Sequence, residues 1–282
     1  AWMELARASN LPTCASNVLV GCAIASGGAA LPWLTAGSVF VSIALLYVGG
    51  MALNDVMDAA HDREHRRDRP IAVGRLSISG ARRFAVGMLA AGGLVAALHG
   101  SAAALMATAL VAAIVGYNWL HKRFAAAAVL MGLCRGLVYG VAAAAVAWPA
   151  DVAALCALAG GLTLYTLLVT VVARGEAGTP RPNRLAAWLL PLVVLPTAAI
   201  IHKGAPQWIA TAGGLLTGCL ASVALLLHGE RPRVLHAVQR QLAGISLVDA
   251  FFLVLLGYEV VALAAVGCFV LTVAGHVRIR GS

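Results

Sequence analysis

The sequence predicts an all-α polytopic membrane protein whose chain crosses the bilayer nine times. Three observations predict this class: the 282 residues are 61% hydrophobic, only 11% of them are charged, and the mean hydropathy is +0.90. A soluble domain carries about 25% charged residues. Because so few charges cannot cover a globular surface of this size, we expect most of the chain to lie in lipid.

Nine apolar runs are long enough to cross a bilayer, which takes about 20 residues of helix. They cover residues 10–30, 33–60, 79–98, 101–120, 125–147, 152–173, 185–202, 207–228 and 246–275. The runs are continuous, unlike the short alternating strands of a membrane barrel, so they predict helices. Basic and apolar residues are mixed over 229–245, which predicts a short helix on the membrane surface. We expect one domain over 1–282, with two pseudo-repeats near 1–123 and 124–245 followed by the final span.

The excess of positive charge predicts how the chain is oriented. The net charge is +9, and sixteen of the twenty Lys and Arg residues fall on one side of the predicted spans. Lys203, Arg278 and Arg280 fall on the other side, and Arg135 lies within a span. Positively charged loops remain in the cytoplasm. We therefore expect an integral protein of a bacterial inner (cytoplasmic) membrane, with the bilayer and not a nucleic acid as the partner of its basic residues.

The most informative stretch lies at the cytoplasmic end of the second predicted span. Asn54, Asp58 and Asp62 recur at every fourth residue, and Asp55 lies beside them. On a helix this spacing stacks three oxygen-bearing side chains on one face, where they repel one another unless a cation lies among them. Mg²⁺ prefers a few carboxylates together with phosphate oxygens. The face therefore predicts a magnesium site, and the alternative is a solvated helix end paired with the arginines of residues 63–69.

Arginines follow this face directly. The loop continues as Arg69-Pro70-Ile71-Ala72-Val73-Gly74-Arg75. Guanidinium groups bind phosphate oxygens in bidentate geometry. A diphosphate held by metal and arginine is therefore the ligand that this stretch suits.

Three motifs carry a resemblance to a known family. The run Asn-Asp-x-x-Asp-x-x-x-Asp, followed by Arg-Pro-Ile-x-x-Gly, resembles the first aspartate-rich motif of UbiA-type membrane prenyltransferases. Residues 7–13 resemble the first helix of that family, and residues 117–122 resemble its Tyr/Lys motif after the fourth helix. The resemblance implies nine transmembrane helices around a central lipid-facing cavity.

The resemblance also implies an activity and a cofactor. UbiA-type proteins join an isoprenyl diphosphate to an acceptor with Mg²⁺. Asn54, Asp58 and Asp62 would hold the metal and through it the diphosphate, and Asp55 would assist as a neighbouring ligand. Metal and cations stabilise the charge that develops on the leaving diphosphate, while apolar helix walls keep water from the carbocation.

The basic and aromatic residues of the motifs take the remaining implied roles. Arg69 and Arg75 would hold diphosphate oxygens, and Lys122 with Tyr117 would help the leaving group. Lys122 lies one residue later than the usual spacing, and His121 occupies the expected lysine position. Tyr47 stands where the hydroxybenzoate branch carries an arginine for the acceptor carboxylate, so a hydroxybenzoate acceptor is disfavoured.

The second aspartate motif of the family is incomplete in this chain. Its place after the sixth span reads Thr170-Val171-Val172-Ala173-Arg174-Gly175-Glu176-Ala177. Our hypothesis is that Arg174 supplies a fixed positive charge in place of a second metal, or binds an anionic acceptor. Glu176 would be a lone ligand or a general base. The alternative is that Arg174 and Glu176 only pair at the lipid interface, where exposed pairs contribute about 0–1 kcal/mol.

The acceptor is open at this stage. Residues 131–135 and 173–176 resemble a divergent UbiA-like branch of ebo-type gene clusters, whose companion enzymes handle sugars or cyclitols. This implies a polar, polyol-like acceptor. Two alternatives remain: a UbiA-type terpene cyclase that needs no acceptor, and a catalytically degenerate protein that binds isoprenoid lipid.

Three charged residues fall inside predicted spans, where a charge costs roughly 2.5–3.5 kcal/mol. Asp249 is expected near the cytoplasmic headgroups. Arg135 and Glu259 are expected at similar depth, which favours either a structural pair or a cluster that binds the acceptor. Asn10, at the start of the first span, would line the same cavity or cap a helix.

Overall fold

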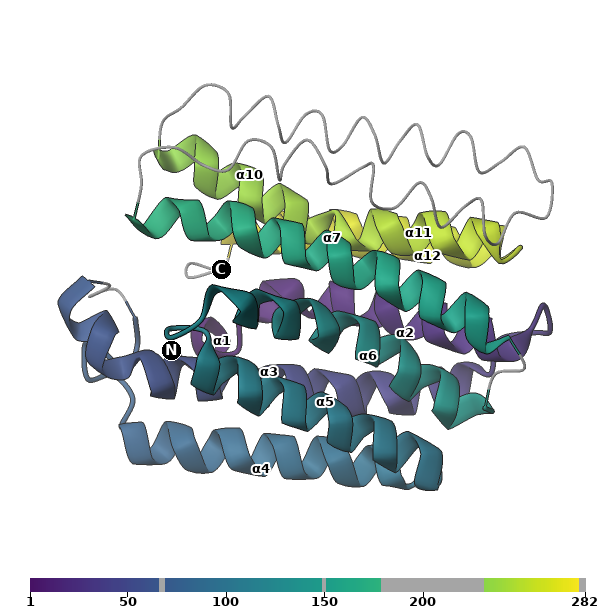
Figure 1. Ribbon diagram of the computed structural model, residues 1–282, viewed down its shortest axis with the longest axis horizontal. Coiled ribbons are helices and arrows are strands. Elements are labelled where there is room, and N and C mark those ends of the chain that lie inside the picture. Colours follow the sequence, from purple (N-terminus) through teal and green to yellow (C-terminus); the bar gives the residue numbers. More distant parts are fainter. Residues whose placement is uncertain (66–68, 149–150, 179–230, 279–282) are drawn as a thin grey trace.

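The computed structural model describes residues 1–65, 69–148, 151–178 and 231–278, and helices are the regular secondary structure of this part of the chain (Figure 1). Its long helices run along one common axis (Figure 1). Within these described residues, six segments are long and apolar enough to cross a membrane. The predicted class, an all-α polytopic membrane protein, is confirmed. The predicted spans 185–202 and 207–228 lie outside the described residues.

The first half of the chain forms a short entry segment and four long helices. In chain order they are α1 (Trp2–Leu5), the 3-10 turn η1 (Ala8–Asn10), α2 (Leu11–Ser26), α3 (Trp33–His65), α4 (Ile78–Ala97) and α5 (Ser101–Leu120). Pro12 lies in the first turn of α2, and Gly27 ends this helix in the left-handed region at φ 56°. Ser77 begins α4, since its hydroxyl accepts a hydrogen bond from the Gly80 backbone N–H at 3.1 Å.

The second half adds the 3-10 turn η2 (Ala125–Ala127), α6 (Ala128–Val146), α7 (Val152–Gly178), α10 (Arg231–Ala243), α11 (Ile245–Leu255) and α12 (Glu259–Arg278). The core lies where α2, α6, α7 and α11 meet, and its largest fully buried side chains include Tyr139, Tyr165, Phe251 and Phe252. Apolar side chains also cover the outside: Val260, Leu263 and Val270 of α12 are exposed. An exposed apolar face of this kind suits contact with lipid.

The last apolar run, predicted as one span over 246–275, is two helices. Helix α11 ends at Leu255, Gly257 takes a left-handed φ of 83°, and α12 returns from Glu259. The Tyr258 hydroxyl donates to the Ala29 carbonyl at 2.7 Å and accepts from the Gly28 N–H at 3.0 Å, which fixes this turn to the α2–α3 loop. A single glycine is a weak signal for a turn within an apolar run, so hydropathy alone did not separate the two helices.

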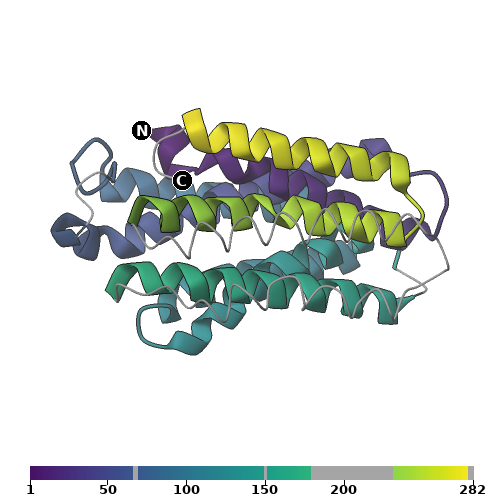
Figure 2. The ribbon, with the colours of Figure 1, turned by 90° about the horizontal axis from the view of Figure 1, so that it is seen from above.

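The predicted surface helix over 229–245 is also wrong. Figure 2 shows α10 and α11 (green to yellow-green) lying end to end beside α12 (yellow). Together they form one candidate span, Leu235–Leu255, most of which is buried inside the protein. The polar residues of α10 made it resemble a surface helix, but its apolar residues Ala237 and Val238 pack against Val172 of α7.

Because the last apolar run forms two helices, α12 ends on the opposite side of the bundle from the one predicted. His276 Nε2 lies 2.8 Å from Asn10 Oδ1, so α12 ends beside the start of α2. Arg278 therefore lies at the end of the bundle where α3 also ends, which we call the motif end, and not on the far side as predicted. Arg280 and Lys203 lie outside the described residues. The predicted pseudo-repeats stay a prediction.

Candidate active site at the motif end

The acidic residues occupy the last turns of α3, which continues to His65, beyond the predicted end of its span at residue 60. Their spacing places them on one side of the helix. Only 9% of Asn54, 2% of Asp55 and 6% of Asp62 is exposed, so this side faces the protein interior and not lipid. The extra length of α3 carries the acids away from its apolar part to the motif end.

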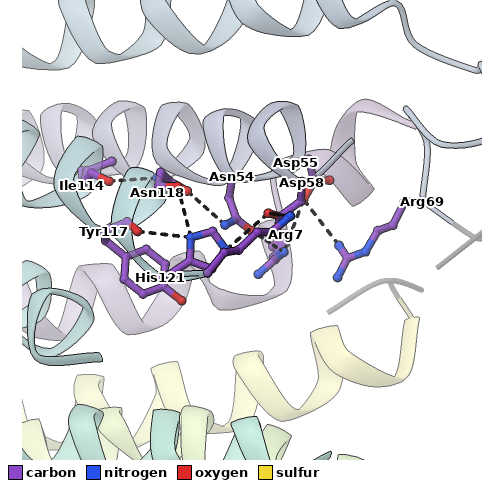
Figure 3. A network of polar contacts seen from close by, with 10 residues as sticks. Arg7, Asn54, Asp55, Asp58, Arg69, Ile114, Tyr117, Asn118 and His121 are labelled. Carbon is purple, nitrogen blue, oxygen red and sulfur yellow. Dashed lines mark hydrogen bonds and ion pairs between the residues drawn. The ribbon is translucent and has the colours of Figure 1, made fainter. Parts of the chain in front are cut away.

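Arg7 binds the first two residues of this face, and the sequence had suggested for it only a loop charge. Its Nη2 lies 3.3 Å from Asn54 Oδ1 and 3.3 Å from Asp55 Oδ1 (Figure 3). Arg69 approaches the same Asp55 oxygen at 3.7 Å. The signal that could have identified Arg7 is its position as the one basic residue before the first apolar run.

The end of α5 meets the acidic face from the other side (Figure 3). Asn54 Nδ2 donates to Asn118 Oδ1 at 3.0 Å. Asp58 Oδ1 lies 2.7 Å from Lys122 Nζ and 3.3 Å from His121 Nε2. His121, at the expected lysine position, and Lys122, one residue later, therefore reach the same carboxylate, which the one-residue change of spacing did not reveal.

His121 is held by its own helix end. Its Nδ1 lies 3.2 Å from the Tyr117 carbonyl and 3.1 Å from the Asn118 carbonyl, and the Tyr117 ring stacks on the imidazole with centroids 5.1 Å apart. The hydrogen bond to Asp58 raises the pKa of His121. Both ring nitrogens face acceptors, so this environment favours the imidazolium.

The residue types of this face suit a hard divalent cation, because carboxylate and amide oxygens are the ligands that Mg²⁺ takes in proteins. Among the described residues, the buried Asp55 Oδ2 has no hydrogen-bond partner, so one oxygen is available. Asp55 and Asp58 are otherwise paired with basic side chains. Among the described residues no three His, Cys, Asp or Glu side chains converge closely enough to hold a metal ion. The metal roles of Asn54, Asp55, Asp58 and Asp62 stay predictions.

Two other predicted residues lie near the site but make different contacts. Arg75 Nη2 binds Glu4 Oε2 of α1 at 3.0 Å. Asn10 contacts His276 of α12, as described above. The proposed roles of Arg75 toward diphosphate and of Asn10 toward substrate stay predictions.

A mostly apolar pocket extends from this site into the bundle, between α2, α3, α5 and α6. Tyr117 and Asn118 line it next to the acidic face, and Ile43, Leu46 and Ile114 line its length. Tyr47, Cys14 and Arg135 also line this pocket. The predicted cavity is therefore present, and it joins the polar motif end to an apolar interior.

The predicted pair between Arg135 and Glu259 is wrong. Glu259 begins α12 and is exposed. Arg135 Nη1 instead donates to Asn17 Oδ1 at 3.0 Å, and Asn17 Nδ2 donates to Asp249 at 2.8 Å. Asp249 is fully buried and not near the headgroups, because α10 and α11 cross together and place it within their common span.

The residues predicted to replace the second motif lie in the last turns of α7, which ends at Gly178. The side chains of Arg174 and Glu176 lie outside what the structure describes. Their roles toward a metal or an acceptor stay hypotheses.

Comparison with known proteins adds a family match and a fold match. The model of the UbiA prenyltransferase family matches residues 14–239. Digeranylgeranylglyceryl phosphate synthase of Methanoculleus marisnigri is 36% identical over 98 residues, which is 35% of this chain and 34% of the relative. The match thus spans about a third of the length of that curated relative.

Two solved structures share the fold at low identity. A UbiA homologue from Aeropyrum pernix K1 superposes with a TM-score of 0.69 at 17% identity, covering 87% of this chain and 96% of that one. A UbiA homologue from Archaeoglobus fulgidus bound to GPP and Mg²⁺ gives a TM-score of 0.59 at 14% identity, covering 93% of this chain and 99% of that one.

Proposed function

Because the chain belongs to the UbiA prenyltransferase family, we propose that it transfers an isoprenyl group from an isoprenyl diphosphate to a polar, polyol-like acceptor in the cytoplasmic membrane. The observation that carries this proposal is the meeting of acids and bases at the mouth of an apolar pocket. Arg7, Lys122 and His121 converge there on the acidic face of α3. A diphosphate headgroup suits the polar mouth, and an isoprenyl tail suits the pocket.

The basic residues would hold the leaving group. Arg7 and Arg69 would bind diphosphate oxygens, and Lys122 would neutralise the charge that develops as the allylic C–O bond breaks. Mg²⁺, held by Asn54, Asp58 and Asp62, would supply further neutralisation of that charge. The leaving diphosphate would stay at the motif end, outside the apolar pocket.

The pocket would control what reacts with the carbocation. Its walls of Ile43, Leu46 and Ile114 offer no polar atoms to water. The acceptor hydroxyl would form the new C–O bond and give its proton to a general base, the role suggested above for Glu176. Excluding water favours this transfer over hydrolysis.

Two observations support a hydroxyl-bearing acceptor. The archaeal relative named above is a synthase of a glyceryl phosphate that carries geranylgeranyl groups. The residues around Arg135 and Arg174 resemble the UbiA-like branch of ebo-type gene clusters, which suggests a polyol or cyclitol. We propose that Arg174 and Glu176 act near this acceptor.

Product analysis tests the proposal. Purified full-length protein in lipid nanodiscs is incubated with Mg²⁺, geranyl or geranylgeranyl diphosphate, and glycerol, myo-inositol or their monophosphates. We expect a prenyl ether and an equal amount of released diphosphate by mass spectrometry, and no turnover with EDTA. Intact diphosphate in every mixture would contradict the proposal. A cyclised hydrocarbon formed without acceptor would replace it with the cyclase alternative.

A matched pair of variants links turnover to the site. Asp58→Asn removes the carboxylate charge that Lys122 and His121 contact. We expect its turnover to fall about 100-fold, because charge arranged for a leaving group is worth this much in enzymes. Glu259→Gln removes an exposed carboxylate at the far end of α12 and should retain wild-type turnover. Equal rates for the two variants would count against the proposed site.

A further inference from the structure

A second polar cluster lies in the membrane core, away from the acidic face. Asp249 of α11 is 0% exposed, and three side chains of the described residues donate to its carboxylate. Ser16 Oγ and Tyr139 Oη each lie 2.5 Å from it, and Asn17 Nδ2 lies 2.8 Å from it. The donors come from α2 and α6, so the carboxylate joins three helices and its oxygens are satisfied, as burial requires.

Asn17 links the Asp249 carboxylate to Arg135 through hydrogen bonds. Its amide nitrogen donates to Asp249, and its amide oxygen accepts from Arg135 Nη1 at 3.0 Å. The orientation of the amide is fixed because each end has a partner of the required type. Arg135 and Asp249 therefore form a charge pair with no net charge, separated by one amide.

Arg135 faces the same pocket that begins at the acidic face. Its guanidinium lies 5.7 Å from the centroid of the Tyr47 ring, and Nη1 also approaches Cys14 Sγ at 3.5 Å. A guanidinium has five N–H donors. Within the described part of the chain its hydrogen bonds engage Nη1, which leaves Nη2 and Nε for a ligand in the pocket. A charge kept in the membrane core beside a cavity is a candidate for a functional role.

We propose that Arg135 binds the acceptor by donating hydrogen bonds to neutral hydroxyl oxygens, with Asn17 and Asp249 as the residues that position it. This inference rests on the proposed function and names the substrate class of its acceptor. A neutral ligand is favoured because Asp249 already balances the charge of Arg135. An anionic ligand would add an uncompensated negative charge near a buried carboxylate, which is unfavourable in a medium of low dielectric constant.

The position of Arg135 in the pocket agrees with this role. The same pocket is lined by Tyr117 and Asn118, beside the acidic face, and by Arg135 and Cys14. A donor whose diphosphate lies at the motif end would extend its isoprenyl tail into this pocket. A polyol bound to Arg135 would then lie inside the water-excluding walls that the reaction needs.

Calorimetric titration tests the inference on the full-length protein in nanodiscs, loaded with Mg²⁺ and the non-reacting donor geranyl thiolodiphosphate. The titrants are myo-inositol, glycerol and their monophosphates, which differ in charge but share the hydroxyl groups. We expect a neutral polyol to bind wild type more tightly than its phosphate does. Arg135→Gln should weaken polyol binding about tenfold or more, since a hydrogen bond to a charged group is worth about 1.5–3 kcal/mol.

Two further variants separate binding from mere support of the fold. Arg135→Lys keeps the charge but not the planar set of donors, so it should bind the polyol more weakly than wild type does. Asp249→Asn removes the balancing charge, so the preference should shift from the polyol to its phosphate. A structural role alone would not reverse this preference. Donor binding and the thermal unfolding midpoint are measured for each variant to confirm that it is folded.

The outcomes distinguish the two proposals. If no neutral polyol binds donor-loaded wild type, if Arg135→Gln binds it as wild type does, or if wild type prefers the phosphate, the assignment of Arg135 is overturned. If the donor analogue with Mg²⁺ does not bind at all, the proposed function fails instead.

Discussion

Arg7, which binds the acidic face, has a backbone conformation that is unusual for a residue other than glycine. Its φ of 44° and ψ of 50° lie in the left-handed region, and among the described residues it is the one non-glycine with positive φ. This conformation costs about 1–2 kcal/mol for a side chain with a Cβ. The contacts to Asn54 and Asp55, and a 3.5 Å contact from the Tyr47 hydroxyl to the Arg7 carbonyl, offset the strain. The chain thus turns sharply before α2 to aim a guanidinium at α3.

Arg7→Gln tests whether this residue supports the fold as well as the site. Among the described residues, the variant leaves the buried Asp55 carboxylate with Arg69 at 3.7 Å as its remaining cation. We expect the free energy of unfolding to fall by about 1–3 kcal/mol, because a buried polar group loses a partner. Denaturation in detergent measures it. Arg123→Gln removes the same charge at an exposed position and should change stability little; equal losses would contradict the assignment.

Tyr139→Phe tests the hydrogen bonding of the core cluster. The variant removes one of the three donors to the buried Asp249 carboxylate. We expect a loss of about 1.5–3 kcal/mol in unfolding free energy, as for other hydrogen bonds to charged groups. Tyr258→Phe removes a hydroxyl bonded to a neutral carbonyl in an exposed turn, so its loss should be smaller. A larger loss for Tyr258→Phe than for Tyr139→Phe would contradict this expectation.

At the scale of elements, α3 and α4 pack closely because a glycine lies at their contact. A Cβ at Gly92 would lie 2.7 Å from Leu46 Cγ and 2.9 Å from the Ser42 carbonyl oxygen. The Ser42 hydroxyl donates to the Gly92 carbonyl at 2.7 Å, which joins the two helices directly. Small residues that allow such approach are typical of helix contacts in membranes. The close position of α4 beside α3 therefore depends in part on the missing side chain of Gly92.

Gly92→Ala and Gly93→Ala form a matched test of this contact. At Gly93 a Cβ meets no described atom within 4 Å, whereas at Gly92 backbone and side chain are both too close. We expect Gly92→Ala to lower the unfolding free energy by about 1–3 kcal/mol through overpacking. Gly93→Ala should be neutral or stabilising by up to about 1 kcal/mol, since alanine favours helix. The measurement is the thermal unfolding midpoint of each variant. Similar midpoints for the two variants would argue against close packing of α3 on α4.

At the scale of the whole molecule, both ends of the described chain lie at the motif end (Figure 1). The contact between Asn10 and His276 ties the start of α2 to the last turn of α12. The basic residues Arg7, Arg69 and Lys122 share this end with Arg278. Under the positive-inside rule we expect this end to be cytoplasmic.

Reporter fusions test this topology. We expect green fluorescent protein fused after Arg278 to fluoresce and alkaline phosphatase at the same point to be inactive, since both would lie in the cytoplasm. Truncation after Gly257 removes α12, so phosphatase fused there should become active outside. Active phosphatase after Arg278 would instead support the single final span that hydropathy predicted.

The sequence predicted what depends on local spacing and missed what depends on distant contacts. The face of Asn54, Asp58 and Asp62 follows from helix periodicity, so it could be predicted without a structure. Arg7 is 47 residues from Asn54, and no local pattern joins them. The sequence suggested Glu259 as the partner of Arg135, whereas the structure links Arg135 to Asp249 through Asn17. The depth of Asp249 and Glu259 in the bundle depends on the turn between α11 and α12, which hydropathy does not reveal.

The pairing of Asp58 with Lys122 and His121 has a consequence for the order in which ligands load. A free metal ion would have to displace these cations and leave them without a counter-charge. A metal that arrives with a polyanion brings new partners for the displaced bases. Loading should therefore be cooperative: each ligand raises affinity for the other by the same factor, as thermodynamic reciprocity demands.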